Sequence, residues 1–241
     1  MLNKNGRSSI YPVAGIHYFP TGIDAIDGHL KGGGLWEKEI AFLCGRPGIG
    51  KTAVAVDIAT NLGWACSKVA YIDLTESPET MAYFAHETEE DAEYHLDSVT
   101  LQYVCPGKIS AIRSSIVESD ADVVIIDYAQ LIDLENFETL EEALRSLPSS
   151  KAYLVLSQIS RDASSRETHF PEISDLLSVN GNYLPCATIM LYRDSYYEGT
   201  SAEEMEAFIY RGDTIVGHGH WLWTPKEYIE PYMKSLKEGK I

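Results

Sequence analysis

Residues 45–52 have the sequence GRPGIGKT, which matches the pattern G-x-x-x-x-G-K-[ST] at every fixed position. The apolar run EIAFLCG (39–45) precedes it and is typical of a buried strand, while TAVAVDIATNLGWA (52–65) follows with helical periodicity. Glycines between a strand and a helix let backbone N–H groups turn inward at a helix N-terminus, which favours anions. The stretch therefore predicts a phosphate-binding loop within an α/β fold.

The predicted nucleotide-binding residues are those of the whole loop: Gly45, Arg46, Pro47, Gly48, Ile49, Gly50, Lys51 and Thr52. In such a loop Lys51 reaches the β- and γ-phosphates, and the Thr52 hydroxyl holds Mg²⁺. VVIIDYAQL (123–131) ends a second apolar run with Asp127, the expected place for a carboxylate acting on the same ion. A lone aspartate at a strand end is more often a cap, but beside an intact phosphate loop it indicates a metal ligand. The predicted cofactors are ATP and Mg²⁺.

Short β-branched runs alternate with helical patterns along the chain, which is typical of a mostly parallel sheet flanked by helices. The expected core strands are residues 39–45, 68–74, 122–128, 152–158 and 187–193. Helices are expected at 52–65, from Ser77-Pro78 onward, and at about 137–147. Next, EEMEAFIYR (203–211) and HGHWLWT (218–224), joined by GDTIVG, predict antiparallel strands at the sheet edge, and Thr224-Pro225 predicts a short C-terminal helix.

The charge of the 241-residue chain is unevenly distributed. Its 19 Lys+Arg and 36 Asp+Glu give a formal net charge of −17, which ordinarily argues against a polyanionic partner. Residues 73–97 and 118–142 each hold nine acids and no Lys or Arg, so the rest carries 18 acids and 19 bases, a net +1. Nucleic acid is therefore not excluded. The acidic stretch HETEEDAEYHLD (86–97) indicates a solvated helix face or a surface that docks a basic protein partner.

The sequence carries neither a recognisable targeting signal nor a metal-binding cysteine pattern. The N-terminal sequence MLNKNGRSSIYP lacks the apolar run of a signal peptide, and no apolar run approaches the roughly 18 residues of a membrane span. The four cysteines are scattered, without the paired spacing of a zinc site. We expect a cytoplasmic protein with no membrane contact, in which residues 1–20 form an N-terminal extension and 21–241 a single domain.

In their order along the chain, these motifs resemble the RecA-like superfamily and, within it, the motor domain of DnaB-type replicative helicases. The resemblance starts at TGIDAIDGHLKGGGLWEKEI (21–40), a segment that KaiC-like ATPases share, and runs to about Thr224. LSQISR (156–161) is similar to the third family motif, and LYRDSYY (191–197) to part of the fourth. The resemblance implies a RecA-like P-loop NTPase fold. Because it already begins at Thr21, we expect no N-terminal collar domain.

The resemblance also implies an activity and an assembly. It implies an ATPase that forms a homo-oligomeric ring, a hexamer, and acts on single-stranded DNA in the ring's channel. Within it, Gln158 would sense the γ-phosphate, and Arg211 would enter the neighbouring subunit's site as an arginine finger. A positive charge there stabilises the transition state and makes hydrolysis depend on assembly. The alternative for Arg211 is a strand-end arginine paired with a carboxylate.

The chain departs from the family pattern at positions that bear on function. Thr75 aligns with the catalytic glutamate, so Glu76, one residue later, is our candidate to polarise the attacking water. The alternative for Glu76 is a first-turn acid favoured by the helix dipole. A lysine usually found two residues before the finger is Ile209, and an arginine of an SDLR-like string is Leu177.

DNA binding depends on two arginines. Between residues 159 and 192 the bases are Arg161 and Arg166, against four acids, and these two are the candidates for contact with DNA phosphates. Two functions therefore stay open. One is an ATP-dependent helicase motor, and the other is a KaiC-like or DnaB-paralogue module whose ATP-gated assembly binds protein without translocating DNA.

Overall fold

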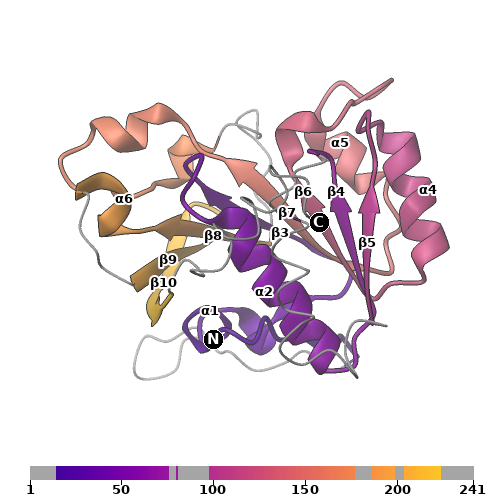
Figure 1. Ribbon diagram of the computed structural model, residues 1–241, viewed down its shortest axis with the longest axis horizontal. Coiled ribbons are helices and arrows are strands. Elements are labelled where there is room, and N and C mark those ends of the chain that lie inside the picture. Colours follow the sequence, from indigo (N-terminus) through magenta and orange to yellow (C-terminus); the bar gives the residue numbers. More distant parts are fainter. Residues whose placement is uncertain (1–14, 76–79, 81–97, 177–185, 199–203, 224–241) are drawn as a thin grey trace, which may run out of the picture.

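The computed structural model describes residues 15–75, 80, 98–176, 186–198 and 204–223. Within them, eight strands form one central sheet (Figure 1). In sheet order these are β10 (Thr214–Leu222), β9 (Glu204–Arg211), β8 (Ala187–Tyr192), β3 (Ile40–Gly45), β7 (Ala152–Gln158), β6 (Val123–Asp127), β4 (Val69–Asp73) and β5 (Val99–Tyr103). Neighbours from β8 to β5 are parallel, and β9 and β10 are antiparallel. The expected mostly parallel sheet with antiparallel C-terminal edge strands is confirmed.

The sheet separates two hydrophobic layers, as the alternation of side chains along each strand requires. In β3, Leu43 belongs to the layer beneath helix α2 (Lys51–Trp64), together with Ile58 of that helix. The neighbouring Phe42 belongs to the opposite layer, with Ile112 of α4 (Ile109–Ser119) and with α5 (Leu140–Arg145). Both layers are buried, so strands such as β6 are apolar at consecutive positions.

Smaller elements lie around this core. A two-stranded sheet is formed by β1 (Tyr18–Phe19) and β2 (Leu35–Trp36). Between these strands in the sequence lie α1 (Asp24–Asp27) and the 3₁₀ turn η1 (Lys31–Gly33). Further short turns are η3 (Ala129–Leu131), η4 (Arg161–Ser165), η5 (Ile173–Asp175) and helix α6 (Asp194–Glu198). Among the described residues, no helix combines the length and the apolar character that crossing a membrane requires.

The strands expected in the core are all present, and each lies within one residue of its expected ends. The helix expected at 137–147 is α5, which starts at Leu140 because the Thr139 side chain accepts a hydrogen bond from the Glu142 N–H (3.2 Å) and caps it. Strand β5 and helix α4 were not expected. The helices expected at Ser77-Pro78 and at Thr224-Pro225 lie outside the described residues.

The connection between the two C-terminal strands is shorter than the sequence predicts. The segment GDTIVG was expected to join the two strands, but Gly212 and Asp213 alone connect them, and residues 214–217 belong to β10. Gly212 has φ +61°, a left-handed conformation that glycine adopts without steric cost and that permits the tight turn. The pair is consequently a long hairpin with Thr214 opposite Arg211 and Leu222 opposite Glu204.

The unexpected helix α4 provides a test of this packing. Ile112 is fully buried against the sheet, whereas Val117 on the same helix is 67% exposed. We expect Ile112→Ala to lower the free energy of unfolding by about 2–5 kcal/mol, because it leaves a cavity in the core. Val117→Ala is the matched control and should change it by less than about 1 kcal/mol. Urea unfolding measures both, and equal effects would mean that α4 does not pack as described.

Candidate active site

The loop of residues 45–50 connects β3 to α2 at the carboxyl end of the parallel strands, the edge at which open α/β sheets bind ligands. Gly48 and Gly50 have φ values of +79° and +114°, which residues other than glycine rarely adopt. A Cβ atom on Gly50 would also lie 2.7 Å from the Trp223 ring. The loop therefore needs glycine at position 50 both for its backbone conformation and for its contact with Trp223.

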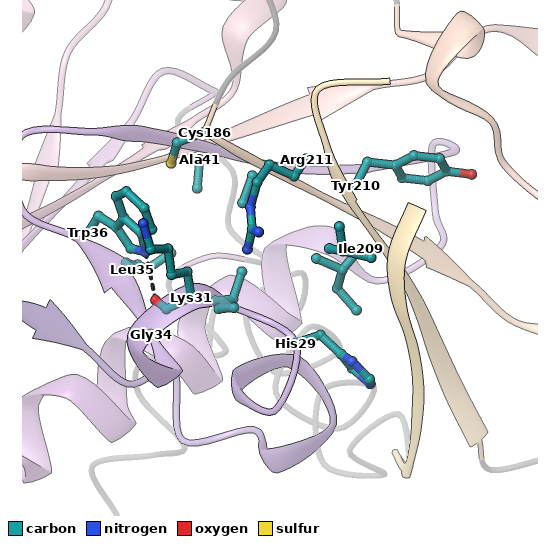
Figure 2. Close-up of a pocket in the computed structure, with 13 residues that line it drawn as sticks. His29, Lys31, Gly34, Leu35, Trp36, Ala41, Cys186, Ile209, Tyr210 and Arg211 are labelled. Atoms are coloured by element: carbon teal, nitrogen blue, oxygen red, sulfur yellow. Dashed lines mark hydrogen bonds between the residues drawn. The ribbon is translucent and has the colours of Figure 1, made fainter. Parts of the chain in front are cut away.

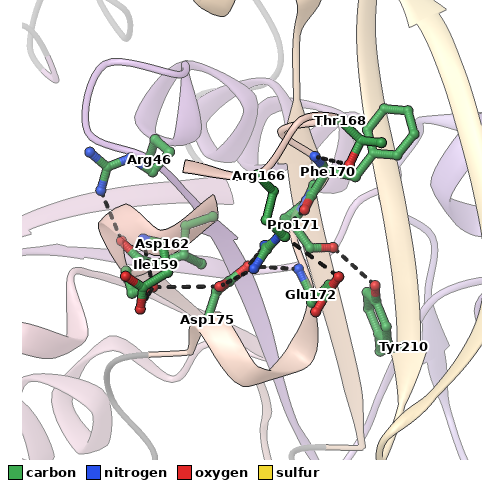
Figure 3. Close-up of polar contacts among 11 residues, drawn as sticks. Arg46, Ile159, Asp162, Arg166, Thr168, Phe170, Pro171, Glu172, Asp175 and Tyr210 are labelled. Carbon is green, nitrogen blue, oxygen red and sulfur yellow. Dashed lines mark hydrogen bonds and ion pairs between the residues drawn. The ribbon is translucent and has the colours of Figure 1, made fainter. Parts of the chain in front are cut away.

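Two hydrogen bonds join the loop to other motifs. The Arg46 guanidinium donates to the Ile159 carbonyl through Nη1 (3.2 Å), and the Tyr196 hydroxyl donates to the Pro47 carbonyl (2.9 Å) (Figure 3 for Arg46). Ile159 and Tyr196 come from the strings LSQISR and LYRDSYY. These family-like strings thus contact the phosphate loop directly.

Lys51 is the first residue of α2, and its side chain is buried. Its ammonium group donates hydrogen bonds to the carbonyl oxygens of Gly45 and Arg46, both at 3.1 Å. Burial lowers the Lys51 pKa to about 8, and the nearby Asp127 carboxyl acts in the opposite direction. The ammonium group is therefore held inside the loop, where bound phosphate oxygens would meet it.

Thr52 and Asp127, which are 75 positions apart in sequence, lie side by side. The Thr52 Oγ1 donates to Asp127 Oδ2 at 2.8 Å, and the hydroxyl of the fully buried Tyr71 donates to the same oxygen at 2.9 Å. Burial raises the Asp127 pKa, and these two hydrogen bonds oppose that shift. A hydroxyl and a carboxylate are the oxygen ligands that Mg²⁺ prefers, so these residues fit the expected ion.

Gln158 ends β7 opposite Gly45, the first residue of the loop. Its backbone N–H donates to Gln130 Oε1 (3.2 Å), and Gln130 Nε2 donates to Ser157 Oγ (3.0 Å). The amide of Gln130 thereby joins η3 to the end of β7. Sequence reasoning missed Gln130, although it stands in the string VVIIDYAQL, and it also missed Tyr71.

Arg211 lies at the opposite edge of the sheet from the phosphate loop. It ends β9 next to Tyr210, which pairs with Thr188 at the start of β8, whereas the loop follows the end of β3. The intervening strand length is roughly 13 Å at about 3.3 Å per residue. Figure 2 shows the Arg211 side chain in a pocket that His29, Trp36 and Cys186 also line. It makes no ion pair with any residue in the described part of the chain.

The two arginines expected to contact DNA have different surroundings (Figure 3). Arg166 forms an ion pair with Asp175 through both guanidinium Nη atoms and lies 3.7 Å from Glu172 (Nε to Oε1). It also donates to the Phe170 carbonyl (2.8 Å), and the hydrogen bond with buried Asp175 raises the Arg166 pKa. Arg161, by contrast, is exposed. The structure thus engages Arg166 within its own loop.

Two of the residues singled out in the sequence lie outside the described part of the chain: Glu76, the candidate for polarising water, and Leu177. Ile209, which stands where the family has a lysine, is fully buried in β9. Within the described ranges no group of three or more His, Cys, Asp or Glu side chains could hold a metal ion.

Comparison with known proteins gives one family match, since residues 36–157 match the model of the AAA domain family. The chain is 30% identical over 196 residues to a probable plasmid replicative DNA helicase of Chlamydia trachomatis, covering 66% of this chain and 43% of that one. It is 26% identical over 213 residues to a probable replicative DNA helicase of Trieres chinensis, covering 71% and 47%. The chain thus spans less than half the length of these relatives.

Solved structures show the same fold. A solved ATPase domain superimposes with a TM-score of 0.70 at 19% identity, over 88% of this chain and 89% of that one. A DnaB-like replicative helicase, described with its interactions with primase, superimposes with a TM-score of 0.71 at 20% identity, over 88% and 60%. The expected resemblance to DnaB-type motor domains is confirmed at the level of fold.

The lowered pKa of Lys51 predicts a pH dependence of stability. Unfolding returns the side chain to its ordinary pKa of 10.5, so between pH 8 and 10.5 the unfolded chain binds more protons than the folded one. The free energy of unfolding without nucleotide should therefore rise with pH across this window, by up to about 3 kcal/mol relative to Lys51→Met.

Urea unfolding at several pH values measures the difference between the two proteins. The exposed Lys68, which pairs with Asp120 at 2.9 Å, provides the control. That pair raises the Lys68 pKa, so Lys68→Met should not alter the pH dependence between pH 8 and 10. Parallel stability curves for the wild type and Lys51→Met would contradict the burial of a charged Lys51.

Proposed function

The chain belongs to the AAA domain family, and on that basis we propose that it is the ATP-binding and ATP-hydrolysing motor domain of a DnaB-like helicase. In this proposal it is cytoplasmic and works as a homo-oligomeric ring, a hexamer, on single-stranded DNA. The observation that carries the ATPase part is the 2.8 Å contact of Thr52 with Asp127 beside a complete phosphate loop. The replicative helicases among its relatives support the rest.

The loop residues bind and orient the nucleotide in this proposal. Backbone N–H groups of residues 48–52 would surround the phosphates, and the Lys51 ammonium would exchange its two carbonyl partners for phosphate oxygens. Thr52 and Asp127 would hold Mg²⁺, which neutralises phosphate charge when bound. Gln158, at the strand end beside Gly45, would contact the γ-phosphate, and Glu76 remains the proposed residue for polarising water.

The position of Arg211 supports a composite site between subunits. A side chain at the far edge of the sheet cannot serve the phosphate loop of its own chain, so a finger role requires a second copy. The lack of an ion pair between Arg211 and the described residues leaves its charge available for a neighbour's γ-phosphate. A ring of identical chains provides such a neighbour for every site.

The DNA part of the proposal depends on Arg161. Arg166 is engaged by Asp175 and Glu172, which leaves Arg161 as the exposed arginine of η4. The acids that surround Arg166 favour the second candidate function, an ATP-gated assembly module that binds protein without translocating DNA. Both candidates use the same ATP site, and they differ in whether DNA stimulates turnover.

Mixing two inactive variants tests the composite site. Lys51→Ala should abolish turnover because it removes the phosphate contact, and Arg211→Ala should lower it by about 10³-fold or more because it removes the finger. A mixture of the two should regain turnover, since an Arg211→Ala subunit with an intact loop can receive Arg211 from a Lys51→Ala neighbour. An inactive mixture, with both proteins folded and assembled, would exclude Arg211 as a finger in trans.

ATP turnover with and without single-stranded DNA, at a stated low salt concentration, separates the two candidate functions. The helicase motor predicts turnover stimulated by DNA and weakened by added salt, and Arg161→Ala should reduce the stimulation because it removes a phosphate contact. Arg113→Ala, an exposed arginine on α4, is the matched control. A protein that hydrolyses ATP but neither binds DNA nor is stimulated by it would reject the helicase motor and leave the assembly module.

A further inference from the structure

A second carboxylate lies beside Asp127 in the core. Asp73 ends β4 and pairs in register with Asp127 at the end of β6, and its side chain is fully buried. One oxygen, Oδ1, accepts hydrogen bonds from the backbone N–H of Thr75 (2.7 Å) and from its hydroxyl (2.6 Å). The other oxygen, Oδ2, is buried and has no hydrogen-bond partner among the described residues.

An unpartnered carboxylate oxygen in a protein interior needs an explanation, because a buried polar atom without a hydrogen bond destabilises the fold. Here the difficulty is greater, since the negative charge of Asp73 also raises the pKa of the adjacent Asp127 carboxyl. The buried cation nearby, Lys51, already donates to two loop carbonyls. Lys51 also lowers the Asp127 pKa, so within the described part of the chain one buried cation stands beside two buried carboxylates.

The surroundings indicate which charge is missing. Asp127 Oδ2 accepts a hydrogen bond from the Thr52 hydroxyl. Because Asp73 pairs with Asp127 across the strands, a cation bound by Thr52 and Asp127 would lie next to both aspartates. Neighbouring strands are about 4.8 Å apart, a separation that a water molecule on the cation can bridge. Mg²⁺ keeps several waters when it binds to one or two carboxylates, and such waters need acceptors.

We propose that Asp73 is a second acidic residue of the magnesium site, and that its free Oδ2 accepts a hydrogen bond from a water held by the ion. This inference rests on the proposed ATPase function and extends it to a residue outside the phosphate loop and the Asp127 motif. Asp73 is a positioning residue, because it acts through water on an ion that Thr52 and Asp127 bind directly.

The position of Thr75 strengthens this inference. Thr75 aligns with the family's catalytic glutamate, and its hydroxyl donates to Asp73 rather than supplying a negative charge. The carboxylate at this strand end belongs instead to Asp73, two residues before Thr75 and at the last position of β4. The end of β4 thus places the carboxylate of Asp73 beside Asp127.

Asp73→Asn tests the proposal, because asparagine retains the oxygen that accepts from Thr75 and removes the charge. The measurement is binding of a fluorescent, non-hydrolysable ATP analogue as Mg²⁺ is titrated, with a parallel titration in EDTA. We expect the Mg²⁺ midpoint to rise about tenfold or more, as is usual when an outer-shell partner of a metal is removed. Binding in EDTA should stay unchanged, which a merely structural role for Asp73 would not predict.

The matched control is Asp120→Asn, which removes an exposed acid at the C-cap of α4, where φ is +48° and asparagine is well tolerated. It should leave the Mg²⁺ midpoint unchanged. If Asp73→Asn does not fold, Asp73→Ser, whose hydroxyl can also accept from the Thr75 N–H, takes its place.

The outcomes are distinguishable. A Mg²⁺ midpoint equal to that of the wild type in a folded Asp73 variant overturns the role of Asp73 and leaves the ATPase proposal standing. Equal weakening with Mg²⁺ and in EDTA also overturns it, because Asp73 would then support only the loop. A wild-type chain that binds no nucleotide with Mg²⁺ overturns both proposals.

Discussion

The hydrogen bond between Thr52 and Asp127 depends on most of the fold. Thr52 is positioned by the first turn of α2, and Asp127 by the end of β6, two strands away from β3. The contact forms only if β3, β7 and β6 lie in this order and in parallel register, so that their carboxyl ends coincide. The buried apolar layers on both faces of the sheet maintain that register. The packing of the core therefore determines the geometry of the site.

The features that short-range patterns specify could be predicted from the sequence. The phosphate loop, α2 and the doubly buried strands have unambiguous composition, and Thr52 and Asp127 followed from them. Strand β5 was missed because Thr100 and Gln102 interrupt its apolar residues, as an edge strand permits. Helix α4 was missed because its four serines mask the buried Ile109, Ile112 and Ile116. Tyr71 and Asp73 could not be found, since their contacts with Asp127 or their place beside it depend on the pairing of β4 with β6.

The two acidic stretches of the chain each contribute one aspartate to the site. Asp73 and Asp127 come from the two acidic stretches, and strand pairing brings them together next to the buried Lys51. Asp175 shows a second use of acid, because it is buried and organises the η4–η5 loop through Arg166 and through the Glu172 N–H (2.8 Å). A total of −17 consequently says little about DNA, whereas the local pairing of each arginine says a good deal.

The hairpin of β9 and β10 runs along β8 at one side of the sheet, and its two ends meet different partners. At one end Trp223, just after β10, lies against Gly50 of the chain's own phosphate loop. At the other end Arg211 precedes the tight turn at Gly212. In a ring of the proposed kind, one stiff ribbon would connect the nucleotide of one subunit to that of the next. Each phosphate loop would then lie between two hairpins, its own chain's through Trp223 and a neighbour's through Arg211.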